Sequence, residues 1–154
     1  MTRVFRNADQ LRAAVGDHLG YGEWVSIDQA RIDAFAEATG DRQWIHVDPA
    51  RAAASPSGGT IAHGFLTLSL VPALLSSVIE YAGWSARVNY GSNRVRFPSP
   101  VKVGSLVRAG AELAAVSFTP AGHLVTLRVV VDITYDSQLQ PKPAVVAETI
   151  TLLT

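Results

Sequence analysis

The chain has 154 residues, of which 48% are hydrophobic and 17% are charged. This composition is typical of a globular domain and excludes a disordered chain or a fibre. Thirteen Lys and Arg residues balance thirteen Asp and Glu residues, so no overall charge favours binding to nucleic acid or to an acidic membrane surface. The sequence contains no Cys, which excludes disulfides, a thiol nucleophile and a thiolate metal site.

Targeting and domain signals are absent from the pattern of the sequence. The stretch 1–15 lacks the continuous apolar run of a signal peptide. The most apolar segment, 65–75, is shorter than the ~20 residues that cross a bilayer. We therefore expect a cytoplasmic protein that does not span a membrane. No repeat, low-complexity tract or charge block divides the chain, so residues 1–154 are expected to form a single domain.

The first third of the chain carries three helix-capping signatures. They are Asn7 with Gln10, Ser26 with Gln29, and Asp48 with Pro49. The first helix is expected to stop at Gly16 and the second at Gly40, because glycine commonly ends a helix. The third helix is expected over 50–54. A short strand is expected over 21–25, between the first two helices.

The rest of the chain divides into one apolar helix and a series of strands. Residues 64–82 are apolar on nearly all sides, which predicts a long buried helix that is kinked at Pro72. After Trp84, stretches rich in Val, Thr and Leu are separated by Pro and Gly. These stretches predict strands over 86–97, 103–118, 123–135 and 144–153. We therefore expect an α+β fold in which a curved antiparallel sheet wraps a long central helix.

Asp41 and His46 lie five positions apart in a loop that is expected between two helices. Such a pair is often only a helix cap or a satisfied hydrogen bond. Here the acid follows directly on a helix, and Trp44 and Ile45 supply apolar walls. A carboxylate beside an imidazole in such a pocket can hold and polarise one water. We interpret Asp41 and His46 as a candidate catalytic pair.

The glycine-rich stretch 58–64 leads directly into the apolar helix. Free N–H groups at the start of a helix, with the positive end of its dipole behind them, can bind a carbonyl oxygen that gains negative charge. Gly64 has no side chain, so a ligand can approach its backbone closely. An equally open alternative is that Gly58, Gly59 and Gly64 only permit a tight turn.

The sequence resembles the MaoC-like dehydratases, also called (R)-specific enoyl-CoA hydratases. The resemblance covers about residues 20–154 in element order and is carried by Phe35-x-x-x-Thr39-Gly40-Asp41-x-x-x-Ile45-His46-x-Asp48-Pro49, followed by Ile61-Ala-His-Gly64 and an apolar helix. It implies a hot-dog fold and a homodimer with sheet edges paired between subunits. It also implies that water is added to a trans-2-enoyl thioester of coenzyme A or acyl carrier protein, giving the (R)-3-hydroxyacyl product. No cofactor is expected.

The resemblance also assigns roles, residue by residue. Asp41 and His46 match the catalytic pair that orients the water, and which of them takes its proton stays open. Gly64 matches the glycine whose amide binds the thioester carbonyl. The family commonly has Asn-Pro where this chain has Gln followed by Trp44. We therefore expect Trp44, together with Pro72 in the helix that lines the family's acyl tunnel, to alter the preferred acyl length.

Other polar residues allow two interpretations each. His63 can donate to a substrate carbonyl, or it can bond to the loop that precedes it. Arg94 and Arg96 alternate on a strand, which is typical of a solvated face, or they contact the phosphates of coenzyme A. By residue type His46, Asp48 and His63 could bind a metal. No metal site is expected, because Asp48 is better explained as a helix cap and no paired helical spacing is present.

Two alternative functions remain open from the sequence. A hot-dog thioesterase commonly draws an acidic residue from its central helix, and Glu80 is the only carboxylate in that segment here. A non-catalytic acyl-binding or partner subunit is the other alternative, since one scaffold serves several functions. The intact pair of Asp41 and His46 argues against the second. No phosphate-binding loop, dinucleotide fingerprint or basic aromatic patch supports nucleotide or nucleic-acid binding.

Overall fold

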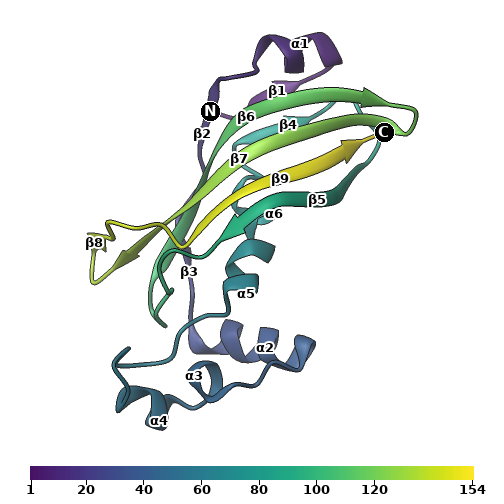
Figure 1. The fold of residues 1–154 in the computed structure, drawn as a ribbon. Helices are drawn as coiled ribbons and strands as arrows, with labels where there is room; N and C mark the ends of the chain where they lie inside the picture. Colours follow the sequence, from purple (N-terminus) through teal and green to yellow (C-terminus); the bar gives the residue numbers. More distant parts are fainter.

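The computed structural model describes all 154 residues and is built around one large antiparallel sheet. The strands of this sheet are β2 (His18–Tyr21), β3 (Val25–Ser26), β5 (Arg87–Arg96), β6 (Leu106–Thr119), β7 (Gly122–Tyr135), β8 (Gln138–Leu139) and β9 (Val145–Leu153). Their order is β2-β6-β7-β9-β5, with β3 added to β6 and β8 added to β7. Figure 1 shows the long strands β5, β6, β7 and β9 as one curved sheet.

Six helices and a second, smaller sheet complete the fold. The helices are α1 (Ala8–Ala13), α2 (Gln29–Thr39), α3 (Trp44–Val47), α4 (Pro49–Ala53), α5 (Gly64–Ser69) and α6 (Val71–Leu74). Strands β1 (Arg3–Phe5) and β4 (Ile79–Tyr81) pair in parallel. In Figure 1, α5 and α6 lie beside the large sheet and α2, α3 and α4 form a group beyond one end of it. None of these helices has the length and apolar character needed to span a membrane.

The prediction of four long strands after Trp84 is confirmed. Strands β5, β6, β7 and β9 cover the four predicted ranges to within a few residues. The alternating residues Val125, Leu127, Val129, Val131 and Ile133 of β7 are all buried. They form one core with residues of the helical side, which include Leu66, Val71 and Leu74. The fold is therefore α+β, as predicted, with the core between the sheet and the segment 64–79.

The prediction of one long central helix over 64–82 is wrong. The segment forms two short helices, α5 and α6, and then the strand β4. Pro72 has no N–H and so cannot bond to the carbonyl of Leu68, which interrupts the ladder of hydrogen bonds between the two helices. Beyond Leu74, the chain is drawn into parallel pairing with β1, where the N–H of Arg3 donates to the Val78 carbonyl (2.8 Å). The end of the predicted helix is therefore a strand, because this segment pairs with β1, about 75 residues away in the chain.

The capping predictions are confirmed at three helix ends. Asn7 caps α1 by accepting from the N–H of Gln10 (3.0 Å), and Asp48 caps α4. Gly40 ends α2 with a φ of 79°, a left-handed conformation that a residue without Cβ adopts at little cost. This last end matters most for function, because it sets the direction in which the chain leaves the helix at Asp41.

The predicted cap at Ser26 is wrong. Asp28 caps α2 instead, accepting from the N–H of Arg31 (2.9 Å). Ser26 belongs to β3, where it pairs with Leu106. The single strand expected over 21–25 is divided into β2 and β3. Long-range pairing with β6 therefore decides the local structure here and outweighs the capping signal of the sequence.

Candidate active site

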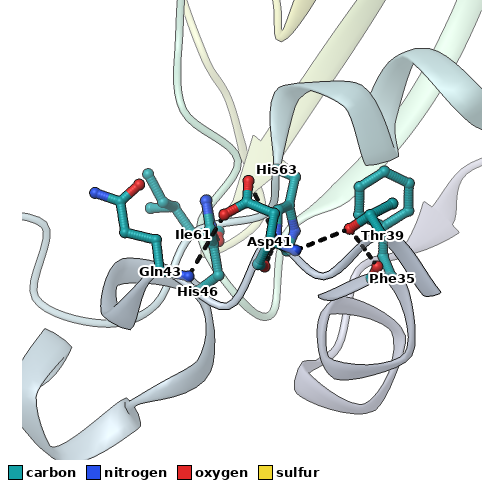
Figure 2. A network of polar contacts seen from close by, with 7 residues as sticks. All are labelled: Phe35, Thr39, Asp41, Gln43, His46, Ile61 and His63. Atoms are coloured by element: carbon teal, nitrogen blue, oxygen red, sulfur yellow. Dashed lines mark hydrogen bonds and ion pairs between the residues drawn. The ribbon is translucent and has the colours of Figure 1, made fainter. Parts of the chain in front are cut away.

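Asp41 stands at the end of α2 with its side chain facing solvent. Its N–H donates to Thr39 Oγ1 (3.3 Å), and the same hydroxyl donates to the Phe35 carbonyl of the last helical turn (2.8 Å). Figure 2 shows Asp41 between Thr39 on one side and Gln43 and His46 on the other. The carboxyl group remains 57% exposed, so the backbone at Asp41 is held while its oxygens stay available to a ligand.

His46 lies in α3 and is buried, with 7% of its surface exposed. Its Nδ1 lies 2.6 Å from the carbonyl oxygen of Ile61. Because a carbonyl can only accept, Nδ1 carries the proton, and Nε2 of the neutral ring is left with a free lone pair. The structure therefore fixes the tautomer of His46 in the form that can take a proton at Nε2. The sequence predicted a loop here, and the helical turn α3 is a difference from that expectation.

His63 packs directly against His46. The two rings stack with centroids 3.7 Å apart, and Phe35 covers the other side of His63 at 4.9 Å. His63 Nε2 donates to the backbone carbonyl of Asp41 (2.8 Å). Of the two interpretations of His63 from the sequence, the geometry favours a structural one, because this donor is already used. Its partner is the peptide of Asp41 rather than the preceding loop.

The polar atoms of Asp41, His46 and His63 lie within 4.8 Å of one another. A metal ion needs lone pairs that converge on one point. The stacked rings of His46 and His63 are inclined by only 23°, so the lone pairs lie in nearly parallel planes, and His63 Nε2 is committed to a carbonyl. This cluster is better suited to holding a water between a carboxylate and an imidazole.

Gly64 begins α5 one residue after His63, and its N–H donates to no protein acceptor. A Cβ at this position would lie 2.8 Å from the ring of Phe97, closer than packed side chains approach. The space beside Gly64 is therefore filled by an aromatic ring of the segment after β5. Phe97 was not singled out from the sequence, since nothing near position 64 indicates that residue 97 lies against it.

A family profile and several known proteins match this chain. The profile of the MaoC like domain matches residues 10–132. The 3-hydroxyacyl-thioester dehydratase Z of Mycobacterium tuberculosis (strain ATCC 25618 / H37Rv) is 48% identical over 148 residues, which is 96% of each chain. The chain belongs to the MaoC-like dehydratase family.

Membership of this dehydratase family makes the chain a hydro-lyase, and two further similarities accompany the assignment. Nodulation protein N of Rhizobium leguminosarum bv. viciae is 47% identical over 141 residues, covering 90% of this chain and 86% of that protein. The solved (R)-hydratase from A. caviae involved in PHA biosynthesis has a TM-score of 0.69 and 27% identity, covering 91% of this chain and 96% of its own. These similarities confirm the family recognised from the motifs at 35–49 and 61–64.

The other candidate residues of this MaoC-like dehydratase lie in three different places. Pro72 lines a cavity of about 460 Å³ between α5, α6 and the strands β5 and β9, together with Leu68, one helical turn beyond Gly64. The guanidinium of Arg51 stacks on the ring of Trp44, with the Arg51 Cζ atom 4.2 Å from the ring centroid. Trp44 does not line the cavity. The structure therefore brings only Pro72 to this cavity.

Arg94 and Arg96 lie exposed near the end of β5, outside the cavity. The cavity also has a polar side that the sequence did not indicate, formed by Tyr81, Arg87 and Thr149 among others. Burial raises the pKa of the Tyr81 phenol to about 12, so this hydroxyl stays protonated. No sequence signal indicated that these residues meet, because β9, which supplies Thr149, is more than 50 residues beyond Tyr81 and Arg87 in the chain.

We expect the acid limb of the pH profile of kcat/KM to have its midpoint below pH 6.5. Burial lowers the pKa of His46 below its ordinary value of 6.5, and His63 lowers it further, against the opposing effects of the Ile61 hydrogen bond and the Asp41 carboxylate. The prediction takes His46 as the base of the reaction proposed below. A base must be neutral to act, so activity should persist as the pH falls through 6.5. Initial rates between pH 5 and 8 test this, and a midpoint at or above 6.5 would contradict it.

The same shift affects stability. Between the folded and unfolded pKa values the unfolded chain binds more protons, so the free energy of unfolding falls as the pH drops below about 6.5. Urea unfolding should show a smaller loss over this range for His46→Gln than for the wild type.

Proposed function

We propose that this chain adds water to trans-2-enoyl thioesters to give (R)-3-hydroxyacyl thioesters, and catalyses the reverse dehydration. The observation that carries the proposal is the meeting of the Asp41 carboxylate with a buried His46 whose Nε2 is free to accept a proton. The names of the relatives agree with it, since they include a 3-hydroxyacyl-thioester dehydratase and, at 36% identity over 88 residues, a 3-hydroxybutyryl-CoA dehydratase of Methylorubrum extorquens. Residues 1–154 would act as one hot-dog domain.

The proposed reaction needs only groups of the chain and one water. Asp41 accepts a hydrogen bond from the water while His46 Nε2 takes its other proton, and the oxygen bonds to C3 of the substrate. The electron pair of the double bond moves toward the thioester oxygen, where the free N–H of Gly64 stabilises the negative charge. The protonated His46 then returns its proton to C2. The OH and the H of one water are thus added, and no cofactor takes part.

The thioesterase alternative finds less support. Glu80 was its candidate acid, on the expectation that it lies on the central helix. In the structure Glu80 belongs to β4, where it pairs with Val4 and is exposed to solvent. A carboxylate in that place is not directed at a thioester bound beside Gly64.

The loss of the conjugated enoyl absorbance tests the proposal directly. The protein is mixed with crotonyl-CoA and with longer trans-2-enoyl-CoAs, and the products are resolved on a chiral column. We expect the (R)-3-hydroxyacyl thioester and no released thiol. Released thiol would favour the thioesterase, and binding without turnover would favour a non-catalytic subunit. The same series on acyl carrier protein decides which carrier is preferred.

We also propose that the chain forms a homodimer through β5. This strand pairs only with β9, so its other edge is open, and it exposes Val88 and Tyr90. An open edge with exposed apolar residues favours pairing with a second copy. The solved ChsH1-ChsH2 complex from Mycobacterium tuberculosis, with 20% identity and a TM-score of 0.68, contains a chain of like fold. A monomeric mass by light scattering at micromolar concentration would refute the homodimer.

Arg94 and Arg96 are proposed to contact the phosphates of coenzyme A. Both guanidinium groups are exposed and neither forms an ion pair within the chain. Replacing both by Ala is expected to raise KM for enoyl-CoA several-fold and to leave kcat nearly unchanged, because charge-assisted phosphate contacts act in ground state and transition state alike. The matched control is Arg12→Ala, which removes a cation on α1. An unchanged KM would exclude the contact.

Pro72 and Trp44 are proposed to set the preferred acyl length. Pro72→Ala is expected to shift kcat/KM along a series of enoyl-CoAs, because Pro72 lines the cavity that begins at Leu68, one helical turn beyond Gly64. Trp44→Ala is expected to have the smaller effect, since its ring packs on Arg51 outside the cavity. Rates from four to twelve carbons measure this. An unchanged chain-length profile in both variants would contradict the proposal.

A further inference from the structure

Gln29, the first residue of α2, uses both ends of its carboxamide in hydrogen bonds. Nε2 donates to the backbone carbonyl of His46 (2.7 Å) and to Asp33 Oδ1 (2.8 Å). Oε1 accepts from the hydroxyl of Thr60, a side chain that is only 1% exposed. One side chain therefore connects the start of α2 with α3 and with the segment that precedes α5.

The same segment also holds the ring of His46. Ile61 follows Thr60 in this segment. The Ile61 carbonyl accepts from His46 Nδ1 (2.6 Å), and the N–H of Ile61 donates to the carbonyl of Ile45 (3.0 Å). The segment is itself anchored to the β5–β6 connection, because the N–H of Val103 donates to the Thr60 carbonyl (2.9 Å). Two routes therefore connect the main chain of α3 with the Ile61 carbonyl. One runs from the His46 carbonyl through Gln29 to Thr60, and the other is the hydrogen bond between Ile45 and Ile61.

We propose that Gln29 is a positioning residue for His46. With Thr60 it fixes the position of the His46 main chain relative to the Ile61 carbonyl. The hydrogen bond from His46 Nδ1 to that carbonyl is thereby kept, which leaves Nδ1 protonated and Nε2 free. The inference rests on the proposed hydratase function. Both ends of its carboxamide are used within the chain, so Gln29 is assigned a role that acts through His46. Misplacing a reacting group by about 1 Å can lower a rate about 10²-fold. Loss of the hydrogen bonds of Gln29 with the His46 carbonyl and with Thr60 should therefore lower kcat and leave KM nearly unchanged.

Three substitutions remove different hydrogen bonds of Gln29 with the His46 carbonyl and with Thr60. Gln29→Met keeps the length of the side chain without polar atoms. Gln29→Glu can still accept from Thr60 but cannot donate to the His46 carbonyl. Thr60→Val keeps the shape of Thr60 without its hydroxyl. The matched control is Asp33→Ala, which removes the other acceptor of Gln29 Nε2 on the exposed face of α2.

We expect the three variants each to lower kcat about 10- to 100-fold with KM within about threefold of the wild type. Gln29→Met combined with Thr60→Val should be no worse than the poorer single variant, because Gln29→Met already removes the one hydrogen bond of this network that Thr60→Val removes. Asp33→Ala should keep kcat within about twofold. If Gln29→Met fails to fold, Gln29→Glu and Thr60→Val carry the test.

NMR of the His46 ring supplies a readout that does not depend on activity. A slowly exchanging Nδ1 proton is expected in the wild type and in Asp33→Ala, and is expected to exchange rapidly in Gln29→Met. Equal kcat in Gln29→Met and Asp33→Ala, or a retained Nδ1 signal in Gln29→Met, would overturn the inference. If the wild-type protein hydrates no enoyl thioester, the proposed function fails, and the NMR comparison still decides the role of Gln29.

Discussion

Asp41→Asn is expected to lower kcat for enoyl-thioester hydration by about 10²- to 10⁴-fold, because a neutral amide no longer polarises the water whose proton His46 takes as general base. The substitution should leave the fold intact, because the carboxyl group is largely exposed and its only hydrogen bond within the chain is a long one, 3.5 Å from the N–H of Gln43. Loss of the enoyl absorbance gives kcat. A melting temperature within about 2 °C of the wild type shows that the fold is unchanged.

His46→Gln is expected to lower kcat by a similar factor. A glutamine amide can still donate toward the Ile61 carbonyl but offers no basic nitrogen in place of Nε2. The matched control for lost charge is Glu37→Gln on α2, whose carboxylate is exposed and pairs only with Arg42. That variant should stay within about twofold of the wild type. Retention of more than a tenth of kcat in either site variant would refute the proposed pair.

Gly64→Ala is expected to destabilise the fold by about 1–3 kcal/mol, the usual cost of overpacking, and to lower kcat/KM. The new Cβ would lie 2.8 Å from the Phe97 ring, so the ring or the start of α5 must move. A shift of α5 displaces the N–H that is proposed to bind the thioester oxygen. Urea unfolding and initial rates measure the two effects separately.

Phe97→Ala in the Gly64→Ala background should restore most of the lost stability. The ring is 40% exposed, so its removal alone costs less than the loss of a fully buried side chain. Coupling between the two substitutions is expected because they share one contact. Strictly additive losses would show that Phe97 is not the reason for glycine at position 64, and would instead favour the interpretation in which a ligand needs that space.

Residues close together in the chain were predicted well. Asp41 and His46 were found because five positions in a short connection keep them near each other in any compact fold, and the structure brings their polar atoms together. The end of α2 at Gly40 followed from the local conformational freedom of glycine. The alternation along β7 predicted its buried face for a similar reason, since a strand turns successive side chains to opposite sides.

Residues that meet only through the fold were not predicted. Gln29 and Thr60 are 31 positions apart, yet one hydrogen bond joins them behind His46. Phe97, the residue that follows β5, packs against Gly64 from 33 positions away in the chain. His63 was considered as a donor to substrate, and only the structure shows that its N–H is used by the Asp41 carbonyl. None of these contacts leaves a periodicity or a motif in the sequence.

The sequence by itself determined the α+β class and the four long strands through local periodicity, and the family through the resemblance of the motifs at 35–49 and 61–64. It also placed Asp41 near His46, because the two are five positions apart in a short connection. The tertiary structure alone decided that the segment 64–82 ends in the strand β4 instead of a helix, and that His46 is held as the tautomer with a free Nε2. The physical reason is the same in both cases. A backbone carbonyl or N–H takes whichever partner the fold brings within reach, and such partners leave no pattern in the chain.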